Sequence, residues 1–207
     1  MSLSERYDEF YKSSLTREVF TDLSSSGWPR SRAEAILAHA GSGTSVLDIG
    51  CGSGHLLFQL RHRFTQLVGL EFSPHRLEQA RINLADLPFR AVQGSAEHMT
   101  GLADDSLDCV VSADTIEHVP DVYRAAAEVF RVLRPGGLLV MNTPNIAFVK
   151  KRLLLLAGRF PSTSQRNEGL GSDVLFDGGH LHYFTFRSLS LLLQRAGFRI
   201  ERRVGYG

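Results

Sequence analysis

The segment of residues 44–55 constrains the fold of this chain more than any other feature of its sequence. Residues 44–49 (TSVLDI) are rich in β-branched and apolar side chains, and they predict a short buried strand. Glycines follow at the alternate positions Gly50, Gly52 and Gly54, where they allow the backbone to turn sharply and to approach a ligand closely. A helix predicted to begin at His55 then presents free amide groups to that turn. The segment therefore predicts a strand, a ligand-binding turn and a helix in direct succession.

The same alternation of short strands and longer helices continues to about residue 142. Further strands are predicted at Gln66–Glu71, Phe89–Gln93, Leu107–Ser112 and Leu138–Asn142, and helices at His55–Phe64, Pro74–Leu84 and Val122–Leu133. Such alternation is typical of an α/β protein whose parallel sheet carries helices on both faces. We therefore expect an α/β fold with a Rossmann-like, doubly wound, mostly parallel sheet of six or seven strands, the sixth at Phe198–Val204.

The two ends of the chain differ from this core, although the length of 207 residues suits a single domain. Residues 1–40 carry the helical patterns Glu5–Phe20 and Arg32–Ala40 and predict a helical cap. After the core at 44–143, residues 145–181 are irregular apart from a helical stretch at Phe148–Ala157, and we expect a lid that covers a substrate. Residues 182–207 complete the domain with a helix at Arg187–Ala196 and the sixth strand.

Composition excludes several classes of protein. The chain has 23 Lys+Arg against 22 Asp+Glu and is 43% hydrophobic, which is too apolar for a disordered protein. No apolar run approaches the roughly 18 residues of a membrane span, and the first twenty residues lack a signal-peptide core. Cys51 and Cys109 are too few for a disulfide framework, so we expect a cytoplasmic protein. The arginines are scattered rather than clustered, which argues against nucleic acid as a partner.

A second acidic residue narrows the choice of ligand. Glu71 ends the second predicted strand, 23 positions after Asp48, where a carboxylate can accept both hydroxyls of a ribose. The G-x-G-x-G loop differs from the G-x-G-x-x-G of nicotinamide dinucleotide sites, and no Gly-Lys pair marks a triphosphate loop. Asp48 is unfavourable beside a pyrophosphate but suits an ammonium or sulfonium group. These features favour an adenosine-containing, positively charged ligand. Two alternative interpretations stay open: Asp48 could only cap the following turn, and Glu71 could be a solvated strand end.

Five segments together resemble one known family. They are VLDIGCGSGHL (46–56), LVGLEFSP (67–74), SLDCVVSADTIEHVPD (106–121), LRPGGLLVMNTPN (133–145) and GHLHYFTFRSLSLLLQRAGF (179–198). In order and spacing they resemble the class I S-adenosylmethionine-dependent methyltransferases, and the last is similar to the small-molecule branch related to ubiquinone-biosynthesis O-methyltransferases. The resemblance covers about residues 40–200 and implies S-adenosyl-L-methionine as the cofactor.

The resemblance also implies a role for individual residues around that cofactor. Asp48, Gly50, Cys51 and Gly52 are expected at its methionine moiety, Glu71 at its ribose, Phe72 beside its adenine, Ser95, Ala96 and Glu97 at the adenine edge, and Ser112, Ala113 and Asp114 past its sulfonium. Many relatives carry Asp where Ser95 stands. In this chain the contact to the adenine amino group is therefore expected to be absent or to be made by Glu97 instead. Tyr7 or Tyr11 could close the site from the N-terminal cap.

Candidate proton acceptors occur in two places. Asp114, Glu117 and His118 follow the fourth strand, and their spacing resembles the E-x-x-E-H pattern that ubiquinone-type O-methyltransferases use for a divalent metal, here Mg²⁺. His118 could instead be a plain base, or the segment could only cap the following helix. His180 and His182 lie in the lid, where one of them could face the site or both could bond backbone.

The function expected from these features is methyl transfer to a hydroxyl of a small molecule by in-line displacement, with amine or carbon acceptors less favoured. The alternative is a cofactor-binding partner or sensor that catalyses nothing. Lys150, Lys151 and Arg152 beside four leucines indicate either an amphipathic lid or a helix that lies on a membrane. A nucleic-acid substrate is disfavoured because the loop after strand four reads SADTIEHV rather than an N-P-P-[YF] pattern. A monomer or a homodimer is expected.

Overall fold

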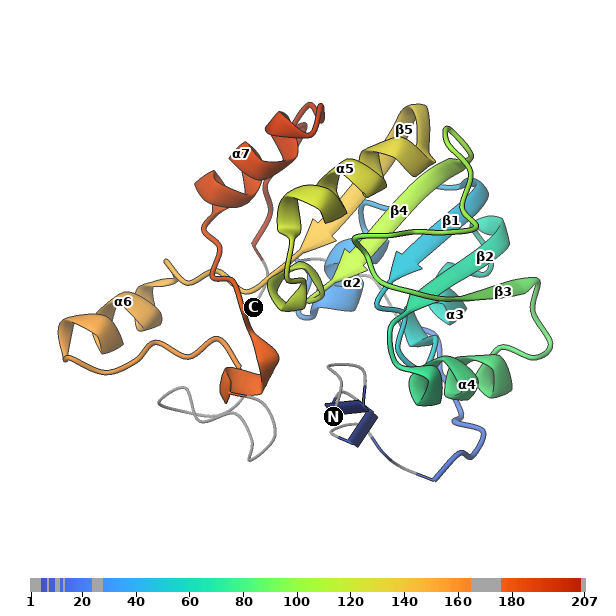
Figure 1. Ribbon diagram of the computed structural model, residues 1–207, viewed down its shortest axis with the longest axis horizontal. Helices are drawn as coiled ribbons and strands as arrows, with labels where there is room; N and C mark the ends of the chain where they lie inside the picture. The colour runs from blue at the N-terminus through green and yellow to red at the C-terminus, as the bar shows by residue number, and fades with distance from the viewer. Residues whose placement is uncertain are drawn as a thin grey trace.

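A parallel five-stranded sheet forms the centre of the protein (Figure 1). The computed structural model describes residues 5–6, 8–9, 12, 14–23, 28–164 and 176–205. The strands are β1 (Gly43–Ile49), β2 (Phe64–Glu71), β3 (Phe89–Gln93), β4 (Leu107–Ala113) and β5 (Leu133–Asn142), in the spatial order β3-β2-β1-β4-β5. The sheet confirms the α/β class and all five predicted core strands, although β5 begins five residues earlier than expected.

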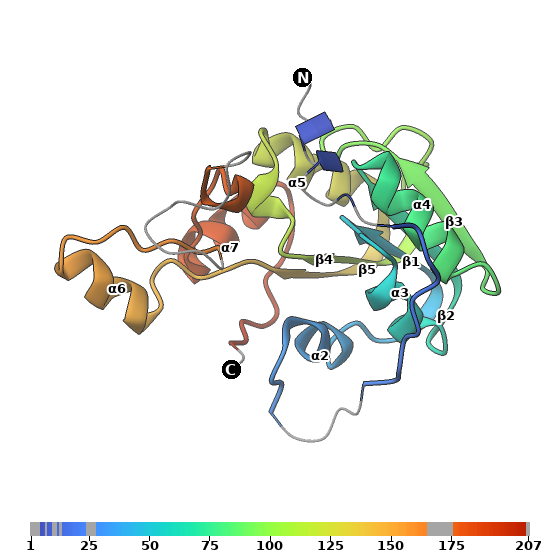
Figure 2. The ribbon, with the colours of Figure 1, turned by 90° about the horizontal axis from the view of Figure 1, so that it is seen from below.

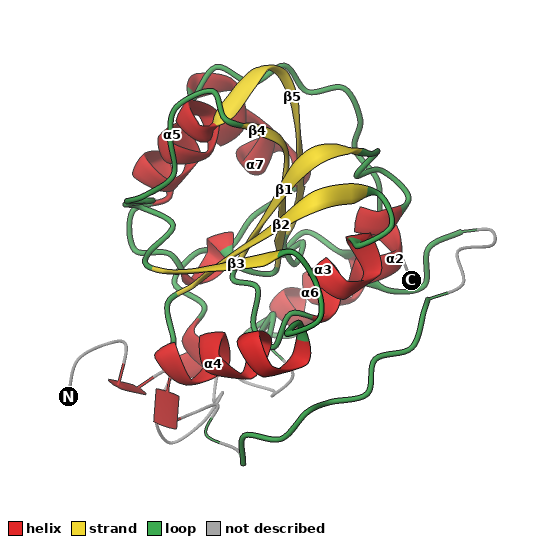
Figure 3. Cartoon of the chain, turned by 90° about the vertical axis from the view of Figure 1, so that its right-hand side faces the viewer, coloured by secondary structure: helices red, strands yellow, loops and turns green. Residues whose placement is uncertain are grey.

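Helices cover both faces of this sheet (Figure 3). One face carries α2 (Arg32–Leu37), α3 (His55–Leu60) and α4 (Pro74–Asn83), while the other carries α5 (Val122–Val132), with α7 (Phe186–Arg195) packed on α5. Along β1, Val46 joins the core on the first face and the adjacent Leu47 joins the core on the second. Both side chains are fully buried, which explains why the strand is apolar at consecutive positions rather than at alternate ones.

Strand order fixes where a ligand can bind. β1 pairs with β2 on one side and with β4 on the other, so the chain leaves β1 toward one edge of the sheet and later returns to the other. In open parallel sheets the crevice beyond the carboxyl ends of the strands at such a switch point receives ligands. The glycine loop that follows Ile49 lies at this point.

The helices α4 and α5 begin where the sequence predicted. Ser73 caps α4 by accepting a hydrogen bond from the amide of Arg76, with Pro74 in the first turn. Asp121 caps α5 in the same way through the amides of Tyr123 and Arg124. Side-chain caps therefore set where both helices begin.

The expected sixth strand at Phe198–Val204 is absent, and among the described residues the sheet has five strands rather than six or seven. Phe198 packs on Phe130 at a ring separation of 5.2 Å, so the segment does contribute to the core. Arg199 and Glu201 pair with each other at the surface, and Arg203 donates to Ser190 on α7. Side-chain contacts to α5 and α7 thus hold this segment in place of a backbone ladder.

The helix expected at Glu5–Phe20 is also not formed over its second half. Residues 14–23, here called the N-terminal strap, are non-helical and lie along α3 and α4. Their backbone is bound by buried side chains of those helices: Gln59 binds Thr21 and Leu23, Gln79 binds Thr16, and Asn83 binds Glu18. These bonds satisfy the backbone that a helix would otherwise satisfy internally.

The segment after β5 leaves the sheet and returns. Residues 143–164 and 176–184, here called the excursion, contain α6 (Val149–Leu156), and Figure 2 shows this helix projecting away from the sheet. The returning part is anchored where the amides of Leu181 and His182 donate to the carbonyl of Glu117 at 2.8 and 3.1 Å. Within the described residues, no helix is long and apolar enough to cross a membrane.

Candidate functional site

A cavity of about 650 Å³ lies beyond the carboxyl ends of β1, β2, β3 and β4. At one end it is lined by residues expected at the cofactor, namely Gly50, Glu71, Phe72, Ser95, Ala96 and Glu97. At the other end it is lined by Asp114, Glu117, His118 and His180. Asp48, Cys51, Gly52 and Ser112 do not line the cavity; they lie behind its wall.

The glycine loop continues the backbone pairing of the sheet. The amides of Gly50 and Cys51 donate to the carbonyl of Leu70 at 2.8 and 3.1 Å, which ties the loop to β2. Gly50 has φ +73°, and a Cβ there would lie 2.5 Å from Oγ1 of Thr115. At Gly52, with φ +55°, a Cβ would lie 2.2 Å from the guanidinium of Arg76. Both positions therefore favour glycine for the backbone angle, and Gly50 also requires it for the close approach to Thr115, whereas the flexible Arg76 side chain could move away from a Cβ at position 52.

Glu71 holds the loop and the start of α4 together. One carboxylate oxygen accepts from the amide of Gly52 at 2.9 Å, and the other accepts from the amide of Ser73 at 3.0 Å. The side chain is 9% exposed but reaches the cavity wall. Each carboxylate oxygen has more than one acceptor position, so Glu71 retains capacity for a ligand hydroxyl.

Asp48 and Cys51 are buried beneath the loop. Burial, together with the neighbouring carboxylate of Glu71, raises the pKa of Asp48 to about 8. Burial likewise raises the pKa of the Cys51 thiol, which makes a reactive thiolate unfavourable. A cation placed above the loop would favour the charged form of Asp48.

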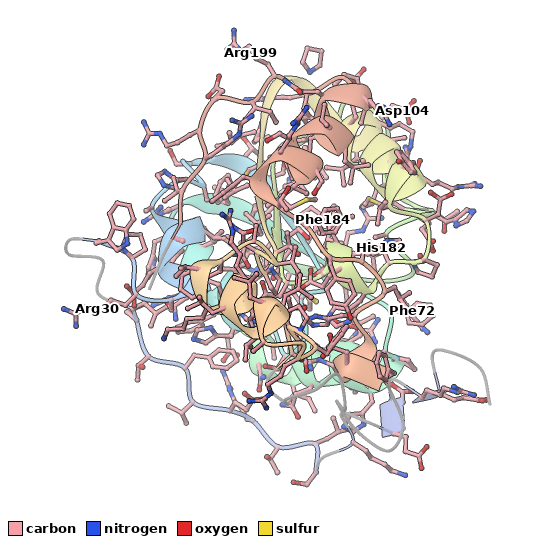
Figure 4. All side chains as sticks on the ribbon, turned by 90° about the vertical axis from the view of Figure 1, so that its left-hand side faces the viewer. Arg30, Phe72, Asp104, His182, Phe184 and Arg199 are labelled. Carbon is pink, nitrogen blue, oxygen red and sulfur yellow. The ribbon has the colours of Figure 1, made fainter. Side chains whose placement is uncertain are left out.

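The loop after β3 supplies the next part of the wall. Ser95 donates to Glu97 at 2.7 Å, while the other oxygen of that carboxylate accepts from the amide of Asp121 at 2.6 Å. Phe72, which is labelled in Figure 4, also lines the cavity, and it is 36% exposed.

Asp114 is bound by an arginine that the sequence analysis did not identify. Arg32, at the start of α2, pairs with Oδ2 of Asp114 at 2.6 Å, and both residues line the cavity. The other oxygen, Oδ1, is buried and makes no hydrogen bond. Asp114 has φ +50°, an uncommon conformation for a residue with a side chain.

Glu117 is a buried acid at the middle of the cavity wall. Its side chain is 1% exposed, and Oε2 accepts from the hydroxyl of Thr143 at 2.9 Å. The second oxygen, Oε1, is buried and without a hydrogen bond. Burial raises the pKa of Glu117 to about 8, so the protonated form is favoured at neutral pH.

His118 and His180 come together from segments about 60 residues apart, with ring centroids 4.6 Å apart. His118 donates from Nδ1 to the carbonyl of Gly179 at 3.1 Å, which assigns the proton of the neutral ring to that nitrogen. His180 shares a hydrogen bond of 2.6 Å with Thr163 through its own Nδ1. Burial lowers the pKa of His118 to about 4 and also lowers the pKa of His180, so both rings are neutral near pH 7.

Of the two histidines predicted in the lid, His180 lines the cavity and His182 does not. The Nε2 of His182 contacts the carbonyl of Pro120 at 3.3 Å, and His182 is not among the residues that line the cavity. The backbone before it is not extended, because Asp177, Gly178 and Gly179 all have positive φ. The buried Asp177 accepts from Ser162 and from Tyr183, and together with Ser164 these hydrogen bonds outweigh burial and lower its pKa.

The structure also brings together a different group of possible metal ligands from the one that the D-x-x-E-H spacing predicted. Among the described residues, Glu117, His118 and His180 offer ligand atoms that all lie within 4.8 Å of one another. Asp114 is outside this group, and its carboxylate is paired with Arg32.

Several residues of the site were not predicted from the sequence. Thr143 directly follows β5, and the carboxyl end of a parallel strand is where a site residue is expected. Arg32 and Thr163 carried no local signal, because each reaches the site through the tertiary fold. Tyr7 and Tyr11, considered as a closing element, lie outside the described residues.

Comparisons with known proteins agree with this geometry. Residues 47–141 match a family model described as a methyltransferase domain. The chain is 30% identical over 169 residues to a "Probable S-adenosylmethionine-dependent methyltransferase" of Mycolicibacterium smegmatis, a match that covers 82% of this chain and 57% of that protein. It is 34% identical to a demethylmenaquinone methyltransferase of Deinococcus radiodurans, covering 68% of this chain and 56% of that one.

A solved structure supports the same assignment. The fold superposes on a SAM-dependent methyltransferase from Thermotoga maritima with a TM-score of 0.62 and 25% identity, covering 82% of this chain and 70% of that one. The chain spans little more than half the length of the two curated relatives described above. From its parallel sheet, its glycine loop and these matches, the chain carries a methyltransferase domain over residues 47–141 and is similar to S-adenosylmethionine-dependent methyltransferases.

Proposed function

We propose that the protein transfers a methyl group from S-adenosylmethionine to a hydroxyl of a small molecule, with amine and carbon acceptors less favoured. The observation that carries this proposal is one cavity lined by Gly50 and Glu71 at one end and by His118 and His180 at the other. A site of this form accommodates a cofactor and an acceptor side by side, and orienting two reactants in this way can lower a barrier by roughly 7–11 kcal/mol.

The cofactor end is suited to a cation that carries a ribose. S-adenosylmethionine supplies a methyl group bound to a positively charged sulfur. Asp48 and Glu71 place two carboxyl groups beneath and beside the glycine loop, and a cation bound there would favour the charged form of Asp48. Glu71 offers its remaining acceptor positions to the ribose hydroxyls, and Phe72 offers an aromatic face at the rim.

The acceptor end is suited to removing a proton. With its proton on Nδ1, His118 presents Nε2 as the acceptor nitrogen of a neutral ring. As the acceptor oxygen bonds to the methyl carbon and the bond from carbon to sulfur breaks, the hydroxyl proton passes to this ring or to His180. A weak base suffices because the hydroxyl becomes strongly acidic as its oxygen forms the new bond.

Turnover with a panel of acceptors tests the proposal. Phenols, sugars, quinols and amines are incubated with S-adenosylmethionine, and S-adenosylhomocysteine is quantified; quinols are included because curated relatives are named demethylmenaquinone methyltransferases. We expect turnover with a hydroxyl compound. Tight binding of S-adenosylmethionine without turnover of any acceptor would favour the alternative, a cofactor-binding partner or sensor.

A metal-assisted version of the same reaction is a second candidate, favoured by the proximity of Glu117, His118 and His180. One carboxylate and two imidazoles suit zinc, manganese or iron better than Mg²⁺, which prefers oxygen ligands. The donor set therefore does not fit the magnesium ion expected from the D-x-x-E-H spacing. Dialysis against a chelator, followed by addition of Mg²⁺, Mn²⁺ or Zn²⁺, distinguishes the two versions: unchanged turnover after dialysis supports the metal-free reaction.

A further inference from the structure

The outward side of α6 is apolar. Val149, Leu153 and Leu156 follow one another at helical spacing and form a single stripe, and their exposed fractions are 60%, 60% and 84%. No residue of this helix is buried, and the half-buried Lys151 and Leu154 lie on the opposite side. A surface helix normally turns its apolar stripe toward the core, so α6 has the reverse orientation.

Positive charge borders this stripe. Lys150 and Arg152 lie on its two sides, one position away from Val149 and Leu153 respectively. Residues 146–164 contain four Lys or Arg and no Asp or Glu. Phe148 and Phe160 extend the apolar surface at the two ends of the helix, with exposed fractions of 51% and 37%. The aliphatic parts of Lys and Arg can lie along an apolar surface while their charged ends reach outward.

The position of α6 leaves the stripe open to an external partner. Figure 2 shows the helix clear of the sheet and of the helices that cover it. By contrast, α7 buries Leu192 and Leu193, and it packs on α5. The charge of the segment selects among partners. A second copy would present the same positive charge and repel, whereas an anionic lipid surface matches both the charge and the apolar stripe.

We propose that α6 docks on an anionic lipid bilayer, lying in its surface with Val149, Leu153 and Leu156 toward the acyl chains. The segment that carries α6 begins and ends at the cavity, since Pro144 and Thr163 both line it. Docking therefore brings one rim of the cavity close to the bilayer. An amphiphilic acceptor would then have a short path into the site, and this last step rests on the proposed function.

Flotation of the full chain with vesicles tests the docking. Vesicles of phosphatidylcholine alone are compared with vesicles that also contain phosphatidylglycerol. We expect the protein to float only with the anionic vesicles, and less of it at high salt. Replacing Leu153 and Leu156 by serine is expected to lower the bound fraction by about tenfold or more. The matched control replaces Val19 and Leu191, two apolar residues exposed elsewhere, by serine and is expected to bind like the wild type.

The charges are tested separately. Lys150→Glu with Arg152→Glu is expected to abolish anionic selectivity, whereas Arg187→Glu with Arg202→Glu, the same change in net charge at other exposed positions, is expected to preserve it. The proposal is overturned if the wild type does not float with anionic vesicles, or if the serine variant binds like the wild type. It is also overturned if the wild type self-associates without lipid and the serine variant does not. S-adenosylhomocysteine affinity is measured on every variant, so a failure of docking is distinguishable from a failure of the proposed function.

Discussion

The two ends of the cavity are built by different means. At the cofactor end, the backbone of one short loop is fixed by the neighbouring strand, through Leu70 and Glu71. At the acceptor end, side chains from distant segments fix one another: Thr143 binds Glu117, and Thr163 binds His180. The first end is therefore encoded in a local motif, whereas the second depends on how the excursion returns to the sheet.

This difference has a consequence for substitution. A change at the cofactor end disturbs a backbone that the whole sheet supports, so it should alter affinity for the cofactor. A change at the acceptor end removes one partner from a set of side chains, so it should alter turnover or local stability and leave cofactor affinity unchanged.

The largest effect is expected at the acceptor end, from His118→Asn. Asparagine retains a donor for the carbonyl of Gly179 but removes the basic nitrogen, and loss of a general base typically costs about a hundredfold or more in turnover. Steady-state kinetics should show a lower kcat, while calorimetry with S-adenosylhomocysteine should show wild-type affinity. His62→Asn, at an exposed position after α3, is the control. Equal kcat in wild type and His118→Asn would remove this residue from the reaction.

The next effect is expected at the cofactor end, from Glu71→Gln. The charge that accepts from the amides of Gly52 and Ser73 is lost, together with a charged acceptor for the ribose. Affinity for S-adenosylhomocysteine should fall about ten- to a hundredfold. Glu78→Gln, an exposed residue of the neighbouring α4, should bind like the wild type. If both variants bind equally well, Glu71 only shapes the loop.

A smaller effect is expected on the pH dependence of stability, through Asp48. Its pKa of about 8 in the folded protein lies above the ordinary value near 4, so between these limits the folded state keeps a proton that the unfolded chain has lost. The free energy of unfolding should therefore fall as pH rises, by up to about 1.4 kcal/mol per pH unit for this group.

Asp48→Asn should flatten that profile when urea unfolding is measured at several pH values between 5 and 8. Glu117 has a pKa raised in the same direction, so only the difference between wild type and variant is assigned to Asp48. Parallel profiles for the two proteins would mean that Asp48 is ionised in the fold.

The smallest effect is expected in the excursion, from Tyr183→Phe. The hydroxyl of Tyr183 donates to the buried Asp177 at 2.8 Å, and its removal should cost about 1 kcal/mol of stability. Because this bond lies within the excursion, amide exchange should become faster in residues 176–184 and stay unchanged in β1 and β2. Faster exchange throughout the sheet would show instead that the two ends of the cavity unfold together.

The sequence predicted the core of the fold because its signals there are local. Consecutive apolar residues such as Val46 and Leu47 mark a strand buried on both faces, and Pro74 and Asp121 mark helix starts. The N-terminal strap escaped prediction because Gln59, Gln79 and Asn83 bind its backbone from other segments. A helical pattern cannot reveal such partners.

The candidate site divides in the same way. Gly50 and Glu71 line the cavity as their spacing implied, and His118 and His180 line it as well. The spacing of His180 and His182 could not tell which of them faces the site; His180 does, whereas His182 contacts the carbonyl of Pro120. The pairing of Arg32 with Asp114 spans 82 positions and has no counterpart in any short pattern.

The contacts of the N-terminal strap make residues 14–23 part of the folded unit. Three amide side chains of α3 and α4 are at least nine-tenths buried under the strap and bonded to its backbone. A chain shortened to begin after residue 23 would expose these amides, and only water could replace their hydrogen bonds. The amides belong to α3 and α4, the helices that follow the glycine loop and Glu71. Removing the strap would thus destabilise the helices that support the cofactor end of the cavity, although it changes no residue that lines the cavity.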